Sequence, residues 1–291
     1  MQVSVVIPAK NEAAAIGDLL TRLVALKIAD EIIVVDDGST DDTAAVATRA
    51  GARVISHHYS KGNGAAIKTG ARAAVGEVIV FMDGDGQHNP NDIARLLDRL
   101  GEGFDMVVGA RNAGGQASTG RHLANTLYNH LASWMSEQHI ADLTSGFRVV
   151  RAEKFREFLP LLPNGFSYPT TSTMAFFRAG HTVAYVPITV AKRIGKSHIR
   201  PLRDGLRFLL IIFRIATLYS PLKLFTPIAV FFMGGGLLYY LYTYSLYGRF
   251  TNMSALLLTT AVIIFLIGLV SEQITQLIYI ELDGRGQDRK Q

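Results

Sequence analysis

The chain has 291 residues, a net charge of +5 and a hydrophobic content of 49%, so its length allows one or two domains. It contains no cysteine, which excludes disulfides and thiolate chemistry. Many of its arginines stand beside long apolar runs in the last third of the chain, which favours an anionic lipid surface over nucleic acid as the partner of the basic charge.

Apolar runs and helical spacings alternate through the first two thirds of the chain. The expected strands cover residues 3–7, 31–35, 53–56, 78–81, 105–109 and 183–187, and the expected helices cover residues 13–26, 44–50, 65–75 and 93–100. Strands that alternate with helices of this length predict an α/β domain with a mostly parallel sheet. Because the chain begins directly with a strand pattern, we expect no signal peptide.

Polar clusters follow three of these strands, at residues 8–12, at Asp36 and Asp37, and at residues 83–87. Ligands bind parallel sheets beyond the carboxyl ends of the strands, so we expect the three clusters to open onto one crevice. The glycine patterns of dinucleotide dehydrogenases and of P-loop NTPases are both missing. The crevice is therefore expected to hold a nucleotide through carboxylates and a metal.

The metal site is expected in the stretch Asp83-Gly84-Asp85-Gly86-Gln87-His88, directly after an apolar strand. Carboxylate oxygens are the preferred ligands of Mg²⁺ and Mn²⁺, and these ions usually also bind substrate phosphates. The pattern favours a divalent cation, with Gln87 and His88 available to complete or orient the shell. A plain turn stays open as the alternative, because Asp-Gly pairs mark turns in any protein.

Several motifs taken together resemble the family-two glycosyltransferases with the GT-A fold. They are Val6-Ile7-Pro8-Ala9-Lys10-Asn11-Glu12, Val34-Val35-Asp36-Asp37-Gly38-Ser39-Thr40-Asp41 and the Asp83 to His88 stretch. Gly109-Ala110-Arg111 and Asp142-Leu143-Thr144-Ser145-Gly146-Phe147-Arg148 add to the likeness. Within the family, the chain is most similar to the polyprenyl-phosphate sugar synthases.

The resemblance implies inverting transfer of one sugar from a UDP- or GDP-linked donor to undecaprenyl or dolichyl phosphate, with Mg²⁺ or Mn²⁺ as cofactor. The implied nucleotide contacts are Pro8, Glu12, Asp36, Asp37, Gly64, Arg193 and Lys196, and the implied metal ligands are Asp83, Asp85 and Gln87. Arg193, Gly195 and Ser197 match the family's Arg-x-Gly-x-Ser-Lys loop near the diphosphate. His198 stands where the lysine is expected, and Lys196 lies two residues earlier.

A lipid phosphate acceptor is already an anion, so it requires cations to position it rather than a general base. The acceptor candidates are Arg111, Arg121, Asn125, Ser145 and Arg148, and the residues expected to carry catalysis are Asp83, Asp85, Arg111 and Arg121. Arginine suits this role because its planar fork binds phosphate oxygens in pairs. Asp142 is expected to orient one of these arginines, and solvated surface arginines are the alternative.

The last third of the chain predicts a membrane region. Arg200, Arg203, Arg207 and Arg214 share one face of a basic amphipathic helix, as found at membrane interfaces, with a buried domain helix as the alternative. Residues 225–247 and 255–280 are each long and apolar enough to span a bilayer. The expected segments are thus a cytoplasmic GT-A domain at 1–198, interfacial helices at 199–222, two spans within 223–282 and a tail at 283–291.

The loop between the two spans, residues 245–254, carries only Arg249. Residues 200–223 before the first span and residues 285–290 after the second are richer in basic residues. The positive-inside rule then places the catalytic domain and the C-terminus in the cytoplasm, on the inner membrane of the cell. The family resemblance and the Gly234-Gly235-Gly236 run favour a homo-oligomer, with a tetramer as one candidate.

Two other functions stay open from the sequence. A transferase that acts on a lipid hydroxyl such as diacylglycerol requires a base, for which Asp142 is the candidate. A non-catalytic, membrane-tethered scaffold that binds nucleotide sugars is the second alternative, and the intact acidic pair Asp83 and Asp85 argues against it.

Overall fold

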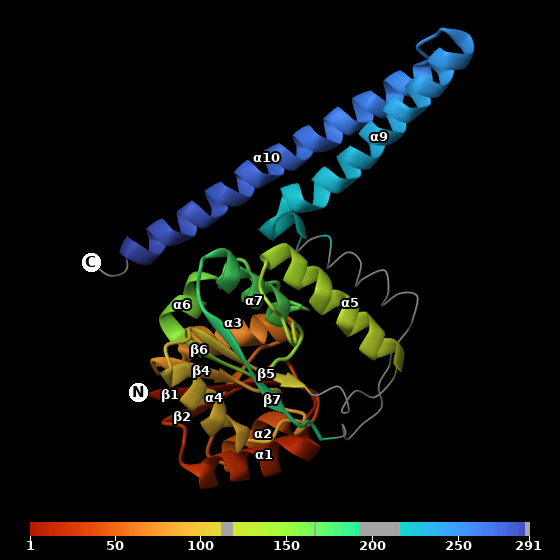
Figure 1. Ribbon diagram of the computed structural model, residues 1–291. Helices are drawn as coiled ribbons and strands as arrows, with labels where there is room; N and C mark the ends of the chain where they lie inside the picture. The colour runs from red at the N-terminus through yellow and green to blue at the C-terminus, as the bar shows by residue number, and fades with distance from the viewer. Residues whose placement is uncertain (112–118, 166, 192–212, 214–215, 289–291) are drawn as a thin grey trace. The chain divides into compact units, whose positions relative to one another are not determined.

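The computed structural model describes residues 1–111, 119–165, 167–191, 213 and 216–288, with the backbone alone for 119–125 and 282–288. The chain divides into two compact units, Met1–Arg200 and Pro201–Gln291 (Figure 1). Most of the expected amphipathic helix at 199–222 lies outside the described residues. The division of the chain into four functional segments stays a prediction.

The first unit is built on a sheet with the strand order β3-β2-β1-β4-β6-β5-β7. Its strands are β1 Val3–Ala9, β2 Glu31–Asp36, β3 Arg53–Ser56, β4 Val78–Phe81, β5 Met106–Arg111, β6 Arg148–Arg151 and β7 Val183–Ile188. All neighbouring pairs are parallel except those of β6, which runs antiparallel to both β4 and β5. The expected α/β class and the mostly parallel sheet are confirmed.

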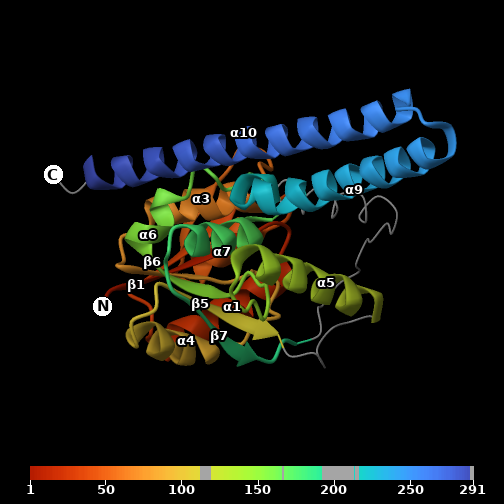
Figure 2. The same ribbon diagram turned by 45° about the horizontal axis from the view of Figure 1, so that its top comes forward.

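The helices of this unit cover both faces of the sheet. They are α1 Ala13–Leu26, α2 Thr43–Arg49, α3 Asn63–Ala73, α4 Asp92–Gly101, α5 Thr119–Ser136, α6 Ala152–Glu157 and α7 Tyr168–Arg178. Helices α1, α2 and α4 lie on one face, and α3, α6 and α7 lie on the other (Figures 1 and 2). Because both faces are covered, β1 and β4 are buried along their whole length, which explains their continuous runs of apolar residues.

Strand β6 was not expected from the sequence. It is only four residues long and has an arginine at each end, Arg148 and Arg151. The two arginines leave only Val149 and Val150 between them, an apolar run too short to indicate a strand. The sequence prediction treated Arg148 as the end of a polar motif, whereas the sheet pairs it with Phe81 on β4 and Val108 on β5.

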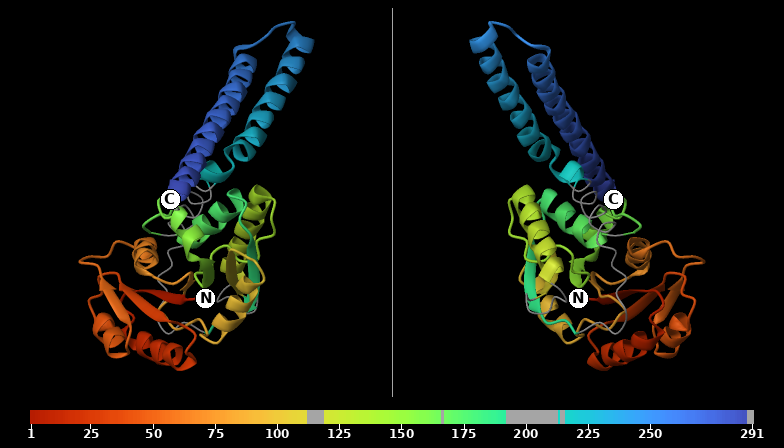
Figure 3. Two further views of the ribbon diagram at one scale, coloured as in Figure 1. Left: turned by 90° about the vertical axis from the view of Figure 1, so that its left-hand side faces the viewer. Right: turned by 90° about the vertical axis from the view of Figure 1, so that its right-hand side faces the viewer.

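The second unit contains two antiparallel helices, α9 Pro221–Tyr247 and α10 Asn252–Asp288, which run side by side (Figure 3). The segments Pro221–Tyr247 and Asn252–Glu281 have mean hydropathies of 1.7 and 2.6, and both are long enough to cross a bilayer. Large side chains such as Phe231 and Leu238 are 77% and 70% exposed, as suits helices that face lipid. The prediction of two apolar, membrane-spanning helices is confirmed at the level of length and composition.

Small residues form the contact between these two helices. The buried residues Ala229, Gly236 and Thr243 recur every seventh position on α9, and Ser254, Ala261 and Thr275 fall in the same seven-residue register on α10. A Cβ on Gly236 would lie 2.9 Å from the Leu258 Cδ2 atom, so the close approach requires glycine there. The seven-residue repeat is typical of helices that pack at a small crossing angle.

Candidate active site

The loops after β1 and β2 are joined by hydrogen bonds into one wall. The backbone N–H of Asn11 donates to the Ser39 Oγ atom at 2.9 Å, and the N–H of Thr40 donates to the Asn11 Oδ1 atom at 2.8 Å. The N–H of Glu12 donates to the Thr43 Oγ1 atom at 2.9 Å. Asn11 has a φ of 55°, a left-handed conformation that asparagine adopts more readily than most residues. This wall therefore places Glu12 beside the carboxyl end of β2.

Pro8 and Asp36 are buried parts of the strands beneath this wall. Pro8 lies within β1 and pairs with Val35 in the parallel register. Asp36 ends β2 with 5% exposure, and its Oδ1 atom accepts a hydrogen bond from the N–H of Ser39 at 3.1 Å. The structure thus brings Pro8, Glu12 and Asp36 to the same edge of the sheet, while their contact with a nucleotide stays a prediction.

The carboxylate of Asp37 is occupied by the chain itself. Its Oδ1 atom contacts the His57 Nδ1 atom at 2.8 Å and accepts from the N–H of Lys61 at 2.8 Å. Its Oδ2 atom accepts from the Ser60 Oγ atom and from the N–H of Gly62, both at 2.8 Å. A carboxylate has about four acceptor positions, and all of them are used here. In this structure Asp37 holds the loop at 57–62, and its expected contact with the base or ribose stays a prediction.

These hydrogen bonds change the acidity of Asp37. Burial alone would raise its pKa, but the hydrogen bond with His57 and the donors of Lys61, Ser60 and Gly62 lower it to about 2. Asp37 is therefore ionised throughout the neutral range. His57, which the sequence reasoning missed, follows the end of β3, so the same strand-end signal that marked the other clusters would have found it.

Gly64, expected at the nucleotide, packs against residues 163–165, and its contact with a nucleotide stays a prediction. A Cβ at this position would overlap the Pro163 carbonyl oxygen and would lie 2.9 Å from the Gly165 carbonyl oxygen. The N–H of Ala65 donates to the Asn164 carbonyl oxygen at 2.9 Å, which joins the start of α3 to the same segment. Because Gly64 has no side chain, residues 163–165 can pack closely against the start of α3.

The acidic pair lies directly after β4. Burial is the largest influence on Asp83 and raises its pKa; nearby Asp85 raises it further, whereas His88, Arg111 and Arg148 act in the opposite direction. The net direction is upward, so the cationic groups nearby do not fully compensate the cost of a charge at Asp83. The Nδ1 atom of His88 is buried without a hydrogen-bond partner. These features fit a divalent cation held by Asp83 and Asp85.

The remaining ligands of such a cation are expected from the substrate. Among the described residues, no group of three or more His, Asp or Glu side chains has the geometry of a metal site. Mg²⁺ typically uses one or two carboxylates together with water and substrate phosphates, so a pair of aspartates is sufficient. The two-carboxylate arrangement favours a site that is completed by a diphosphate.

Gln87, expected as a metal ligand, joins this loop to the segment after β7. Its Nε2 atom donates to the Ala191 carbonyl oxygen at 3.2 Å, and the N–H of Ala191 donates to the Gln87 carbonyl oxygen at 2.9 Å. The expected diphosphate residues Arg193 and Lys196, in the segment that follows Ala191, lie outside the described residues. The role of Gln87 at the metal stays a prediction.

Arg111 ends β5 and is held by Asp142. The Nε atom of Arg111 donates to the Asp142 Oδ2 atom at 2.7 Å, and its Nη2 atom donates to the Asp142 Oδ1 atom at 2.9 Å. Burial alone would raise the pKa of Asp142, but the hydrogen bonds and charge of Arg111 hold it below the usual value. The side chain of Arg111 keeps 27% of its surface exposed. The expectation that Asp142 orients an arginine is confirmed for Arg111.

Arg148, expected at the acceptor phosphate, lies in the core. Its side chain is fully buried, and its Nη1 atom donates to the Pro169 carbonyl oxygen at 2.9 Å and to the Ser172 Oγ atom at 2.8 Å. A guanidinium enclosed in this way cannot meet a lipid phosphate, so our acceptor set leaves it out. Ser145 is buried with its Oγ atom unpartnered, and the side chains of Arg121 and Asn125 lie outside the description.

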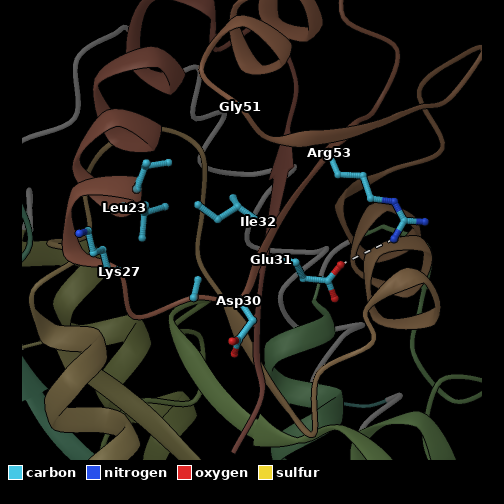
Figure 4. A pocket seen from close by; sticks show the side chains of 9 residues that line it. Leu23, Lys27, Asp30, Glu31, Ile32, Gly51 and Arg53 are labelled. Carbon is cyan, nitrogen blue, oxygen red and sulfur yellow. Dashed lines mark ion pairs between the residues drawn. The ribbon is translucent and has the colours of Figure 1, made fainter.

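A hollow of about 470 Å³ lies elsewhere on this unit, between the end of α1 and the starts of β2 and β3 (Figure 4). Lys27, Glu31 and Arg53 line it, and an ion pair of 3.7 Å joins Glu31 to Arg53. It lies at the amino ends of the strands, whereas the acidic clusters lie at the carboxyl ends. The hollow is therefore not the candidate active site.

The carboxyl edge of the sheet carries an acidic pair after β4 and a fixed arginine at the end of β5. Together with the mostly parallel sheet, this arrangement is typical of α/β enzymes that bind a metal–phosphate substrate. The family model of "Glycosyl transferase family 2" matches residues 4–159, and that of the "GtrB C-terminal hairpin" matches residues 220–277. The chain belongs to glycosyl transferase family 2, and the predicted resemblance is confirmed.

Named relatives agree with this assignment. The chain is 30% identical over 229 residues to the glycosyltransferase AglJ of Haloferax volcanii, which covers 77% of this chain and 75% of that protein. It is 34% identical over 187 residues to an undecaprenyl-phosphate 4-deoxy-4-formamido-L-arabinose transferase of Pectobacterium atrosepticum, covering 58% of this chain and 57% of the relative. The chain thus spans little more than half of that second relative.

Solved structures share the fold of the first unit. Glucosyl-3-phosphoglycerate synthase of Mycobacterium tuberculosis, in complex with Mn²⁺ and UDP-glucose, superposes with a TM-score of 0.61 at 26% identity. The match covers 74% of this chain and 78% of that one. The chain is accordingly a glycosyltransferase that uses a nucleotide sugar.

Proposed function

We propose that this glycosyltransferase moves one sugar from a UDP- or GDP-linked donor to polyprenyl phosphate at a membrane surface. The observation that carries the proposal is the arrangement of opposite charges at the carboxyl edge of the sheet. Asp83 and Asp85 follow β4, Arg111 ends β5, and only β6 separates these two strands. An acidic pair suits a metal–diphosphate donor, and a fixed guanidinium suits an anionic acceptor.

On the donor side, Asp83 and Asp85 are the residues that would hold Mg²⁺ or Mn²⁺. The cation supplies electrostatic stabilisation of the charge that develops on the leaving nucleoside diphosphate. The similar synthase from Mycobacterium tuberculosis was solved with Mn²⁺ and UDP-glucose, which supports the same pairing here. The wall formed by residues 11–13 and 39–43 is the proposed support for the nucleoside.

On the acceptor side, Arg111 is the proposed contact of the lipid phosphate. Asp142 fixes the plane of its guanidinium, so less conformational freedom is lost when a phosphate binds. A phosphate monoester is an anion at neutral pH, and its attack on the anomeric carbon needs no general base. Arg121 and Asn125 stay in the proposed acceptor set through their place on α5.

The membrane unit supports a lipid acceptor. The chain carries two helices of spanning length, and the relative from Pectobacterium atrosepticum is named for undecaprenyl phosphate. The basic residues that flank the spans place the catalytic unit and the C-terminus on the cytoplasmic side in this proposal. Self-association in the membrane remains part of the proposal.

The structure disfavours the hydroxyl-acceptor alternative. That reaction requires a base, and Asp142 was its candidate. The carboxylate of Asp142 is 5% exposed, is occupied by Arg111 and has a lowered pKa, all of which make it a poor proton acceptor. Membership in a family of glycosyltransferases likewise favours catalysis over the scaffold alternative.

The test is product formation by the full chain in detergent or liposomes. The reaction contains undecaprenyl phosphate, Mg²⁺ or Mn²⁺, and a panel of UDP- and GDP-sugars, and mass spectrometry identifies the lipid-linked sugar. We expect one donor class to give product, and we expect chelation and Asp85→Ala each to abolish it. Turnover near the wild-type rate in Asp85→Ala would contradict the metal assignment, and product only with diacylglycerol would contradict the acceptor.

A further inference from the structure

The loop between α5 and β6 touches the acidic pair through a glycine. A Cβ on Gly146 would lie 2.7 Å and 3.0 Å from the two carboxylate oxygens of Asp83. Real Cβ atoms do not approach oxygen this closely, so the carboxylate occupies space that only glycine leaves open. The position of Asp83 thus depends on where the backbone of Gly146 lies.

Two buried side chains fix that backbone. The hydroxyl of Tyr168 donates to the Gly146 carbonyl oxygen at 3.0 Å, and the Nη2 atom of Arg148 donates to the Ser145 carbonyl oxygen. Tyr168 is 1% exposed and Arg148 is fully buried. Consecutive carbonyl groups are therefore anchored to groups that have no room to move.

Arg148 is an unusual residue for this position. Within the described part of the chain it forms no ion pair, and its Nε atom is buried without a hydrogen-bond partner. Its Nη1 atom is instead satisfied by the start of α7, through Pro169, Ser172 and Thr173. Enclosing a guanidinium without a carboxylate in direct contact is costly, and a well-packed apolar side chain is often at least as stable at such a position. A buried charge without an ion pair departs from ordinary core packing, and such departures are typical of functional regions.

We propose that Tyr168 is a positioning residue that sets the orientation of Asp83 through the backbone of Gly146, while Arg148 holds the preceding carbonyl group. The inference rests on the proposed function, because that function assigns Asp83 to a divalent cation. Metal sites require ligands held within about 0.5 Å of the productive geometry, which a free aspartate after a strand end does not provide. The two buried residues provide it from the far side of the loop.

The test uses Mn²⁺ binding to the full chain in detergent, with UDP or GDP present to complete the site, and electron paramagnetic resonance measures free Mn²⁺ after subtraction of the Mn²⁺ that the nucleotide alone holds. We expect Gly146→Ala to weaken the affinity about tenfold or more, and Tyr168→Phe to weaken it several-fold, as is typical of residues that orient metal ligands. The controls are Gly101→Ala, where a Cβ meets nothing within 4 Å, and Tyr247→Phe, which removes an exposed hydroxyl at the end of α9. Both controls should bind Mn²⁺ as the wild type does.

A second measurement separates this inference from the proposed function. Unfolding temperatures are compared for Gly146→Ala in the wild-type and in the Asp83→Ala background. The added methyl should lower the unfolding temperature by several degrees only when the Asp83 carboxylate is present, because the two groups compete for one space.

The outcomes are distinguishable. A wild type that binds no Mn²⁺ in the presence of either nucleotide overturns the metal assignment in the proposed function, and the unfolding cycle then decides whether Gly146 sets the position of Asp83. A wild type that binds Mn²⁺, with equal affinity in Gly146→Ala and Tyr168→Phe, overturns the positioning role alone. An additive unfolding cycle overturns the contact between Gly146 and Asp83.

Discussion

The charged residues at the carboxyl edge of the sheet fall into two groups. Some carboxylates are held by the chain and shape its loops, as Asp37 does with four donors. Others are placed where the proposed reaction needs charge, as Asp83 and Asp85 are. Arg111 belongs to both groups. Asp142 holds one edge of its guanidinium, while part of the side chain stays exposed. Substitution at each kind of residue should therefore have a different signature.

Asp37→Asn should destabilise the first unit. The amide keeps only part of the acceptor capacity for His57, Ser60, Lys61 and Gly62, and hydrogen bonds to a charged group contribute about 1.5–3 kcal/mol each. We expect an unfolding free energy lower by on the order of 2 kcal/mol at pH 7, measured by chemical denaturation. An unchanged stability would contradict the scaffold role of Asp37.

The stability that Asp37 contributes should depend on pH. The folded pKa of Asp37 is about 2, below its ordinary value of 3.8, so its stabilisation is fully present above about pH 4 and is lost as the pH falls through about 2. The stability difference between the wild type and Asp37→Asn should therefore shrink on acidification over that range and stay constant from pH 5 to 8. A difference that grows on acidification would exclude this assignment.

Arg111→Lys should impair use of the lipid acceptor. Lysine keeps the charge but cannot fill the bidentate contact with Asp142, so its ammonium is no longer fixed in place. We expect kcat/KM for polyprenyl phosphate to fall about tenfold or more, with nucleotide binding unchanged. The control is Arg95→Lys, an arginine paired with Asp92 on the exposed surface of α4. Equal losses for donor and acceptor would contradict the assignment.

At the scale of elements, each unit depends on a different periodic pattern. The strands of the first unit carry continuous apolar runs because helices cover both faces of the sheet. The helices of the second unit instead place small residues at every seventh position along their contact, at Ala229, Gly236 and Thr243 on α9. Large apolar residues point outwards there, which is the reverse of a soluble helix pair.

Gly236→Val should weaken the contact between α9 and α10, whereas Gly235→Val should not. A Cβ on Gly236 would meet Leu258 at 2.9 Å, and a Cβ on Gly235 would meet nothing within 4 Å. Both substitutions change helix propensity equally, so the difference in stability between the two variants reports helix packing. Overpacking typically costs about 1–3 kcal/mol. Thermal unfolding in detergent measures it, and equal effects would exclude Gly236 from the contact.

At the scale of the whole molecule, a nucleotide-sugar transferase is joined to a pair of apolar helices in one chain. The combination is consistent with a water-soluble donor and a lipid acceptor, because the reaction then takes place where the two phases meet. The absence of cysteine makes the orientation of the protein open to direct measurement.

Single cysteines should report the proposed topology. Asn252→Cys begins α10 near the short loop between the spans, and Asp98→Cys lies on the exposed surface of α4. In right-side-out membrane vesicles, an impermeant maleimide should label Asn252→Cys, and it should label Asp98→Cys only after lysis. Labelling of Asp98→Cys in sealed vesicles would reverse the orientation that the positive-inside rule predicts.

The sequence by itself determined the features that depend on local patterns. Alternation of apolar strands and helical spacings identified the α/β class, and long, mostly apolar segments of spanning length identified the two long helices. The motif at Asp83 and Asp85 indicated the acidic pair because its residues are neighbours in the chain. Those signals need no knowledge of which distant segments meet.

The tertiary structure decided which partner each charged side chain takes. Asp37 meets residues 57–62, Asp142 meets Arg111, and Gly146 meets Asp83, all across sequence separations that carry no periodic signal. The antiparallel insertion of β6 brings Arg148 into the core, where sequence reasoning had placed it at the acceptor. A charged residue is exposed or enclosed according to the packing around it, and that packing exists only once the sheet has formed.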